Sequence, residues 1–129
     1  LNRIFEATGF PACTDANRID SARAISREFG VITVLKGPHT VVCSENGDEI
    51  RINPTGSPAL ASGGSGDVLT GIIAALLPQL PSPLDAAAAG VYIHGLCAEV
   101  TGEKARRSIH ADDLYQNLGM TLKKLSPFA

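Results

Sequence analysis

The chain has 129 residues, 44% of them apolar and 19% charged, which fits a single folded domain over residues 1–129 and excludes a disordered segment. The formal net charge of -2 and the pI near 5.9 exclude a general attraction to nucleic acid or to anionic lipid. We therefore expect neither nucleic acid nor a membrane as a partner, and any phosphate-binding site must be formed by a few neighbouring residues.

The cysteines Cys13, Cys43 and Cys97 stand far apart and form no CxxC pair. Because an odd number cannot all be joined in internal disulfides, free thiols in a reducing cytoplasm are the simplest interpretation. The longest apolar run, residues 68–77, is too short to span a bilayer. The chain opens at Leu1, in what looks like the middle of an amphipathic segment, so we expect the sequence to start inside a domain.

The first predicted helix covers residues 17–29. Thr14 or Asp15 can cap its start, and Gly30 is placed to end it. The residues expected to share its buried face are Ile19, Ala22, Ile25, Ser26 and Phe29. The residues expected on its solvated face are Arg18, Arg23 and Arg27.

Three strands are predicted next. Residues 31–35 form a β-branched apolar run without alternation, which is typical of a central strand buried on both faces. Residues 40–43 and 49–52 flank the pair Asn46 and Gly47, a strong hairpin signal. We expect a β-hairpin beside the buried strand.

A shaped loop and three helices complete the chain. Residues 53–66 contain four glycines and two prolines, and a helix follows over residues 68–77. Further helices are predicted at 83–101, where small residues allow close packing, and at 111–125. The last helix is expected to pack through Leu114, Leu118, Thr121, Leu122 and Leu125.

This inventory predicts an α/β protein with an incomplete sheet. A parallel central strand needs strand neighbours and helices on both faces, and three strands that include a hairpin cannot supply them. We therefore expect further elements upstream of Leu1.

The most informative segment is the glycine-rich run before the helix at 68–77. Its members are Gly63, Gly64, Ser65 and Gly66, followed by Asp67. Glycines let successive N–H groups point into one concavity, and the helix start adds its positive dipole end, so the run can form an anion hole for phosphate. A carboxylate at that position suits a base that takes a proton from a hydroxyl attacking phosphorus. The alternative interpretation is a plain helix start with a capping aspartate.

The spacing excludes two common glycine loops. No lysine followed by Ser or Thr comes after the last glycine, as a Walker A loop requires, and no GxGxxG leaves a short strand.

A second candidate segment follows the predicted buried strand. Its residues are Lys36, Gly37, Pro38, His39 and Thr40. Because α/β proteins place ligands at strand ends, Lys36 and Thr40 could hold the phosphate or ribose of a nucleotide. The alternative is a lysine at a strand end beside an ordinary turn.

Three segments, KGPHTVV, NPTGSPALASGGSGDVLTGIIAALL and DAAAAGVYIHG, together resemble the C-terminal half of the NAD(P)H-hydrate dehydratase family. This family belongs to the ribokinase-like superfamily, and the order and spacing of the segments match. Sugar kinases of the superfamily usually show GAGD, and thiamine-pathway kinases show a Cys at the position of the acid; this loop looks like neither. The resemblance implies the C-terminal part of a ribokinase-like three-layer sandwich, truncated at the N-terminus.

The resemblance also implies residue roles. Residues 36–40 would contact the nucleotide, and Gly66 would lie on its phosphates. Asp67 would bind the substrate and act as the base, while Asn53 and Gly56 would shape the loop at the nucleotide site. The implied reaction is phosphorylation of the 6-hydroxyl of NAD(P)H-hydrate by ADP or ATP with Mg²⁺, followed by loss of phosphate.

The family carries strands, helices and a PHPGE-like loop before the segment that matches Leu1. We expect this chain to be a truncated or cleaved product, or one half of a molecule whose other half is a separate chain. Its expected protein partner is either a copy of itself in a homo-oligomer or that complementing N-terminal half. Two other functions stay open: a ribokinase-like small-molecule kinase that releases its phosphorylated product, and a non-catalytic nucleotide-binding fragment. His94 is interpreted as a packed helix histidine, and His110, beside Asp112 and Asp113, as part of a polar helix start.

Overall fold

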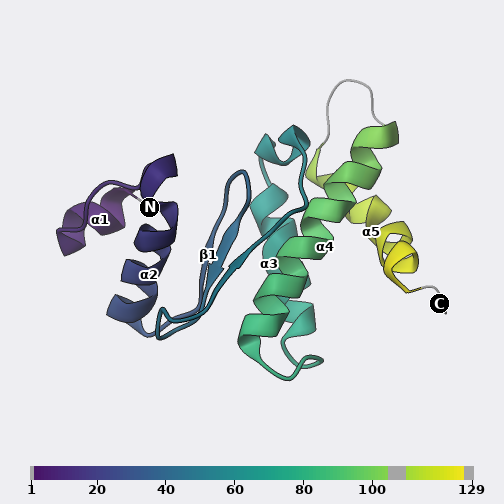
Figure 1. Cartoon of the computed structure of the whole chain (residues 1–129). Helices are drawn as coiled ribbons and strands as arrows, with labels where there is room; N and C mark the ends of the chain where they lie inside the picture. The colour runs from purple at the N-terminus through teal and green to yellow at the C-terminus, as the bar shows by residue number, and fades with distance from the viewer. Residues whose placement is uncertain (1, 105–109, 127–129) are drawn as a thin grey trace. The chain divides into compact units, whose positions relative to one another are not determined.

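The computed structural model describes residues 2–104 and 110–126 and divides into two compact units, Leu1–Ile52 and Asn53–Ala129. The N-terminal unit contains α1 (Asn2–Thr8), the 3₁₀ turn η1 (Asp15–Asn17), α2 (Arg18–Phe29), β1 (Thr33–Leu35), β2 (Val41–Cys43) and β3 (Ile50–Ile52). The C-terminal unit contains the 3₁₀ turn η2 (Pro58–Ala61), α3 (Ser65–Leu76), α4 (Pro83–Lys104) and α5 (Ala111–Leu125) (Figure 1). In the described part of the chain, no helix has the length and apolar character needed to cross a membrane.

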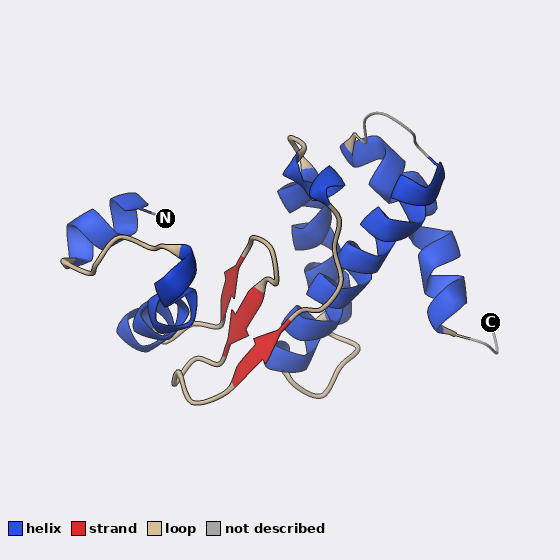
Figure 2. Cartoon of the chain, turned by 45° about the horizontal axis from the view of Figure 1, so that its top comes forward, coloured by secondary structure: helices blue, strands red, loops and turns tan. Residues whose placement is uncertain are grey.

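The three strands form one antiparallel sheet in the order β1-β2-β3 (Figure 2). Thr33 pairs with Cys43 across the first interface, and Val42 pairs with Arg51 across the second. The predicted hairpin is confirmed: Gly47 has a φ of 76°, and its N–H donates to Ser44 O at 2.9 Å. Residues 36–40 make a second turn, so β1 is also joined to β2 as a hairpin.

The core of the N-terminal unit lies between α2 and the sheet. Ala22, Leu35, Val41 and Cys43 pack there as a buried cluster. The predicted end of the helix is confirmed, because Gly30 adopts a φ of 61° and its N–H donates to Ser26 O. The predicted buried face is wrong at its two ends, since Ile19 and Phe29 are 39% and 51% exposed. A sheet of three-residue strands is too short to cover the whole helix.

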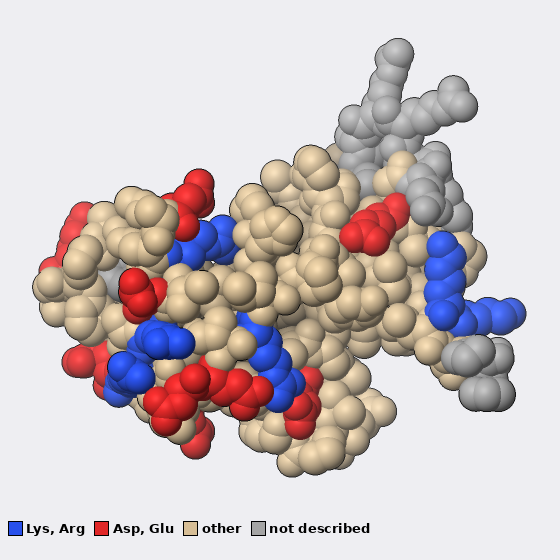
Figure 3. All heavy atoms as spheres, in the orientation of Figure 1, with Lys and Arg blue, Asp and Glu red and all other residues tan. Residues whose placement is uncertain are grey.

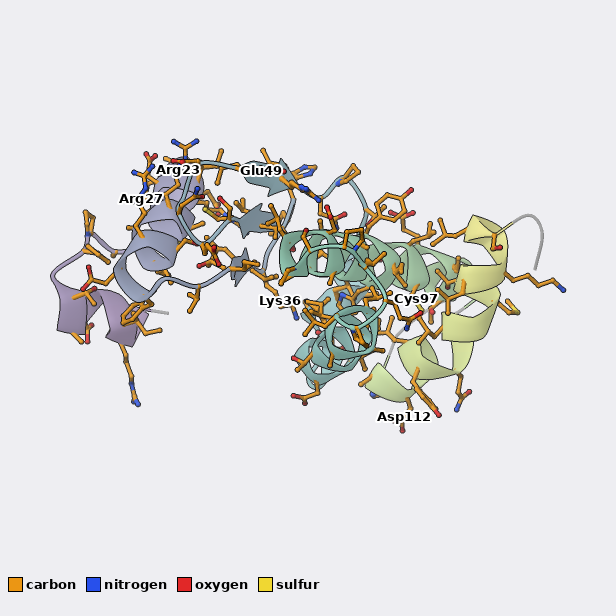
Figure 4. The ribbon with its side chains drawn as sticks, turned by 90° about the horizontal axis from the view of Figure 1, so that it is seen from below. Arg23, Arg27, Lys36, Glu49, Cys97 and Asp112 are labelled. Carbon is orange, nitrogen blue, oxygen red and sulfur yellow. The ribbon has the colours of Figure 1, made fainter. Side chains whose placement is uncertain are left out.

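The prediction of a solvated arginine face on α2 is confirmed at Arg27, which is exposed, and is wrong in part at Arg18 and Arg23, which are half-buried. The Nε of Arg27 donates to Asn46 O at 3.0 Å, and its Nη2 lies 3.3 Å from Asp48 Oδ1. Figure 4 shows Arg23 and Arg27 on α2, and on the face drawn in Figure 3 basic and acidic side chains of the N-terminal unit are interspersed. These exposed pairs contribute only about 0–1 kcal/mol each, but they define where the hairpin turn meets the helix.

Helix α4 is the central helix of the C-terminal unit, and it packs against both α3 and α5. The predicted close packing of its small-residue run is confirmed at Gly90, where an added Cβ would lie 3.4 Å from Ile73 Cα and 2.5 Å from its Cγ1. The helix continues to Lys104, three residues beyond the predicted end. Helix α3 begins at Ser65, so Ser65 and Gly66 belong to its first turn rather than to the preceding loop.

Helix α5 has the predicted bounds. Leu114 and Thr121 are fully buried, and Leu118 packs against the cluster formed by Cys97, Ala98 and Leu114. The prediction that Leu122 and Leu125 are also core residues is wrong, since they are 44% and 41% exposed. At the start of the helix the N–H of His110 donates to Asp113 Oδ2 at 2.9 Å, which agrees with the interpretation of a polar helix start.

The loop that precedes η2 is attached to α4 through Asn53. Asn53 is 8% exposed, and its Nδ2 donates to Thr55 O at 2.8 Å and to Val91 O at 3.4 Å. The Thr55 hydroxyl oxygen lies 2.9 Å from Tyr92 O. About two helical turns further along, Glu99 Oε1 accepts a hydrogen bond from the N–H of Gly56 at 2.9 Å. Residues 53–56 are therefore held to the surface of α4 by side-chain hydrogen bonds.

Gly95 makes this attachment possible. A Cβ built at Gly95 would lie 2.8 Å from both the carbonyl carbon and the carbonyl oxygen of Thr55. Real Cβ atoms do not approach backbone atoms so closely, so the loop or the helix would have to move. Gly71 in α3 is an exposed helical glycine with nothing within 4 Å of its added Cβ.

We expect Gly95→Ala to destabilise the protein by about 1–3 kcal/mol, the usual cost of overpacking. Gly71→Ala is the matched control, and it should stabilise the protein by up to about 1 kcal/mol, because alanine is the better helix former. Urea unfolding followed by far-UV circular dichroism measures both changes. Equal effects of the two substitutions would contradict the close approach of Thr55 to Gly95.

Candidate functional site

The glycine-rich bend before α3 is shaped by Gly64. Gly64 has a φ of 83° and caps the helix, and its carbonyl accepts hydrogen bonds from the N–H groups of Asp67 at 3.0 Å and Val68 at 3.2 Å. A side chain at a positive φ is strained, and an added Cβ would also lie 3.0 Å from Ala111 Cβ. Glycine is therefore favoured at this position by its left-handed backbone conformation and by the tight approach to Ala111.

The bend leaves backbone donors open. Within the described residues, no hydrogen bond to a protein acceptor engages the N–H groups of Gly63, Gly64 and Gly66. The N–H of Ser65 makes a long bond of 3.4 Å to Ser62 O. Because these donors lie at the positive end of the dipole of α3, the bend can accept an oxyanion such as phosphate.

Two buried residues, Ser65 and His94, stabilise the bend through hydrogen bonds. Ser65 is 2% exposed, and its Oγ donates to Leu60 O at 2.8 Å. His94, on α4, is 3% exposed, and its Nε2 lies 2.8 Å from Ser65 O. The expected packed histidine is therefore found, but its ring also makes a polar contact with the bend, which the sequence did not predict.

Asp67 lies in the first turn of α3 and is exposed. No hydrogen bond or ion pair holds its carboxylate among the described residues. A carboxylate in this position is open to a ligand that binds at the helix start. Its predicted role as substrate-binding residue and base stays a prediction.

The second predicted segment, residues 36–40, is the turn between β1 and β2. Gly37 has a φ of 153°, and His39 has a φ of 53°, which is uncommon for a residue with a side chain. The hydroxyl of Thr40 donates to Gly37 O at 3.1 Å, so it stabilises the turn itself. Lys36, labelled in Figure 4, is exposed, as are Pro38 and His39.

Arg18 supports this turn, although the sequence had placed it on a solvated face. Its Nη2 donates to Leu35 O at 3.0 Å and its Nη1 donates to Pro38 O at 3.2 Å. The guanidinium group also lies against Gly37, where an added Cβ would collide with it. No local pattern identifies Arg18, because it is 17 residues from Leu35 in the sequence.

The two predicted segments lie in different units, residues 36–40 in the first and residues 63–67 in the second. Asn53 and Gly56 lie in the second unit and are attached to α4, the helix that also carries His94. In residues 2–104 and 110–126, no group of three or more His, Cys, Asp or Glu residues could hold a metal ion.

Comparison with known proteins places the chain in a family. A family model described as NAD(P)H-hydrate dehydratase matches residues 2–119. The chain belongs to the NAD(P)H-hydrate dehydratase family. The match includes both segments described above, and it agrees with the resemblance found in the sequence.

Two curated relatives and one solved structure illustrate the likeness to members of the NAD(P)H-hydrate dehydratase family. The bifunctional NAD(P)H-hydrate repair enzyme Nnr of Moorella thermoacetica is 42% identical over 84% of this chain and 21% of its own length. The ADP-dependent (S)-NAD(P)H-hydrate dehydratase of Bacillus subtilis is 37% identical over 94% of this chain and 44% of its own length. A crystal structure of the ADP/ATP-dependent enzyme from Bacillus subtilis, co-crystallized with ATP/Mg²⁺, matches with 35% identity and a TM-score of 0.80, over 86% of this chain and 40% of that one. The chain therefore spans less than half the length of each of these proteins.

The structural likeness confirms the predicted fold class, an α/β chain that corresponds to part of a ribokinase-like dehydratase domain. The residue roles that the family resemblance implies stay predictions.

If residues 36–40 contact a nucleotide, replacing Arg18 should weaken nucleotide binding. We expect Arg18→Met to raise the Kd for ADP about three- to tenfold, because the turn loses two hydrogen bonds from a charged donor. Isothermal titration calorimetry on the natural polypeptide that carries this sequence measures the change. Arg27→Met is the matched control. Arg27 donates in the same way to the turn at Asn46, which joins β2 to β3, so this substitution should leave the Kd for ADP unchanged. A normal Kd in the Arg18 variant would contradict a supporting role for Arg18.

Proposed function

We propose that the protein carrying this chain catalyses the ADP- or ATP-dependent dehydration of (S)-NAD(P)H-hydrate to NADH or NADPH, a nicotinamide nucleotide repair reaction. The observation that carries the proposal is the family match over residues 2–119, which includes a helix start with open amides and an exposed carboxylate. The named relatives from Moorella thermoacetica and Bacillus subtilis support the same substrate.

The chemistry explains why a phosphate site and a carboxylate are needed together. Asp67 takes the proton of the 6-hydroxyl of the hydrate, and the oxygen of that hydroxyl attacks the terminal phosphorus of the nucleotide. The bond between this phosphorus and the bridging oxygen of the nucleotide breaks at the same time. ATP would leave as ADP, and ADP would leave as AMP. The ring nitrogen then expels inorganic phosphate, a far better leaving group than hydroxide. Loss of the neighbouring carbon-bound proton restores the dihydronicotinamide ring.

In this proposal the bend at residues 63–66 is the anion hole. The open N–H group of Gly66 would donate to a phosphate oxygen, and Gly63 and Gly64 would add further donors. Residues 36–40 would contact the nucleotide, with Lys36 supplying a positive charge. Asn53 and Gly56 would act indirectly, because their hydrogen bonds hold the loop that leads into the bend.

Magnesium fits this site only together with the nucleotide. The described residues offer no cluster of metal ligands, and Mg²⁺ is commonly held by substrate phosphates with one or two carboxylates. A bound Mg²⁺ would neutralise charge on the phosphoryl group that is transferred.

Because the chain spans less than half of the relatives named above, we propose that its protein partner is a complementing substrate-binding half, in the same or another polypeptide, or otherwise a further copy in a homo-oligomer. We also propose that both units belong to one domain, since a single family model covers them. A cytoplasmic location is supported by the three free cysteines.

The decisive assay supplies hydrated NADH with ADP or ATP and Mg²⁺ and follows the absorbance of restored NADH. We expect the natural polypeptide that carries this sequence to restore NADH only when nucleotide is present, because phosphate must leave in place of hydroxide. Omission of nucleotide and omission of Mg²⁺ are the controls. Phosphorylation of a sugar without restoration of NADH would instead identify a small-molecule kinase, and nucleotide binding without either reaction would identify a non-catalytic binding protein.

Asp67→Asn should reduce turnover by a factor of about a hundred or more, the contribution typical of a general base. Its affinity for nucleotide should be equal or slightly higher, because removing the charge relieves repulsion of phosphate. Steady-state rates and calorimetry measure the two quantities. Asp112→Asn is the matched control, because Asp112 is also an exposed acid in the first turn of a helix, α5. Unchanged turnover in the Asp67 variant would mean that Asp67 is only a favourable charge at the start of α3.

A further inference from the structure

The hydrogen bond between His94 and Ser65 connects a buried titratable side chain to the bend. The chemistry proposed above does not use His94, which lies on α4 with only 3% of its surface exposed. Its Nε2 is 2.8 Å from the carbonyl oxygen of Ser65. Because a carbonyl oxygen can only accept, this contact requires the hydrogen to be on Nε2. His94 is therefore a donor to the backbone of the bend.

The geometry of the peptide group gives this bond its importance. The carbonyl of Ser65 and the N–H of Gly66 belong to the same planar, trans peptide group, so they point in opposite directions. Fixing the carbonyl toward His94 therefore fixes the N–H of Gly66 away from α4. A hydrogen bond to the carbonyl also polarises the peptide and strengthens its N–H as a donor.

This peptide group lies in the first turn of α3, so the helix itself sets its general direction. Gly66 has no side chain that could hold the 65–66 peptide group any further, so the hydrogen bond from His94 is an additional restraint on it. The Ser65 side chain is already held by its hydrogen bond to Leu60 O. Ser65 is thus fixed through its hydroxyl by the preceding turn and through its carbonyl by α4.

We propose that His94 is a positioning residue that aims the N–H of Gly66 at a phosphate of the bound nucleotide. The inference rests on the proposed function, because it assigns the direction of a donor in that same anion hole. His94 touches neither substrate nor nucleotide in this scheme and acts only through the 65–66 peptide group. Its contribution is therefore to phosphate affinity and phosphoryl transfer.

Two substitutions separate the donor from the bulk of the side chain. His94→Gln keeps an N–H donor the same number of bonds from Cβ, whereas His94→Met keeps a similar volume without a donor. We expect Met to raise the Kd for Mg-ADP about tenfold and to lower kcat, and Gln to stay within about threefold of the parent in both. Calorimetry gives the Kd, and thermal unfolding of each variant gives the Tm.

Thr101→Val supplies the control for general destabilisation. Thr101 is also buried on α4, and its hydroxyl donates to Cys97 O at 2.7 Å, away from the bend. This variant should lower the Tm while the Kd for Mg-ADP stays at the parent value. A Kd in His94→Met equal to that of the parent, or equal losses in Met and Gln, would overturn the proposal, because the donor would then have no specific effect.

A measurement on the unmodified protein covers the case in which the Met variant does not fold. Nitrogen-15 NMR of the histidine rings should show His94 with its hydrogen on Nε2, and a ring carrying its hydrogen on Nδ1 alone would overturn the inference.

Failure of the proposed function is distinguishable from failure of this inference. In the first case the parent protein binds neither Mg-ADP nor Mg-ATP, whereas in the second it binds nucleotide and the His94 variants bind it equally well.

Discussion

The left-handed conformation of Gly64 is the constraint on which the candidate site in the C-terminal unit depends. With a φ of 83°, this residue turns the chain sharply into α3 and leaves the first amides of the helix without intrahelical acceptors. A residue with a Cβ would be strained there and would press on Ala111. Because the bend sets the start of α3, it also sets the positions of the open N–H donors and of the Asp67 carboxylate in the first turn.

Helix α4 converts this local bend into a defined structure. Its small residues let neighbouring segments approach closely, at Gly90 for Ile73 and at Gly95 for Thr55. Its polar side chains then hold those segments, since His94 reaches Ser65 and Glu99 reaches Gly56. A helix with larger residues on this surface could not bring these groups within hydrogen-bond distance. The Ala- and Gly-rich composition of α4 thus has a direct consequence for the site that we propose.

The N-terminal unit uses a similar device for its turns. Arg18 and Arg27 lie on the same helix, and each donates to carbonyl groups of one turn of the antiparallel sheet. Each arginine side chain also lies against a glycine, Gly37 or Gly47, where an added Cβ would meet it. The turn at residues 36–40 therefore has a fixed backbone, which is what a nucleotide-binding turn requires if little entropy is to be lost on binding.

The sequence by itself determined the order of the elements from α2 onward, the hairpin at Asn46 and Gly47, the end of α2 at Gly30, the bounds of α5 and the glycine bend, because these features depend on the chemistry of a few adjacent residues. It did not predict α1 as a separate helix. Family membership was equally readable, since it rests on short strings at fixed spacing. Only the tertiary structure decided that Arg18 supports a turn, that Ile19 and Phe29 stay exposed, and that His94 contacts Ser65. The physical reason is distance along the chain: Arg18 and Leu35 are 17 residues apart and His94 and Ser65 are 29 apart, so no local propensity or periodicity encodes these contacts.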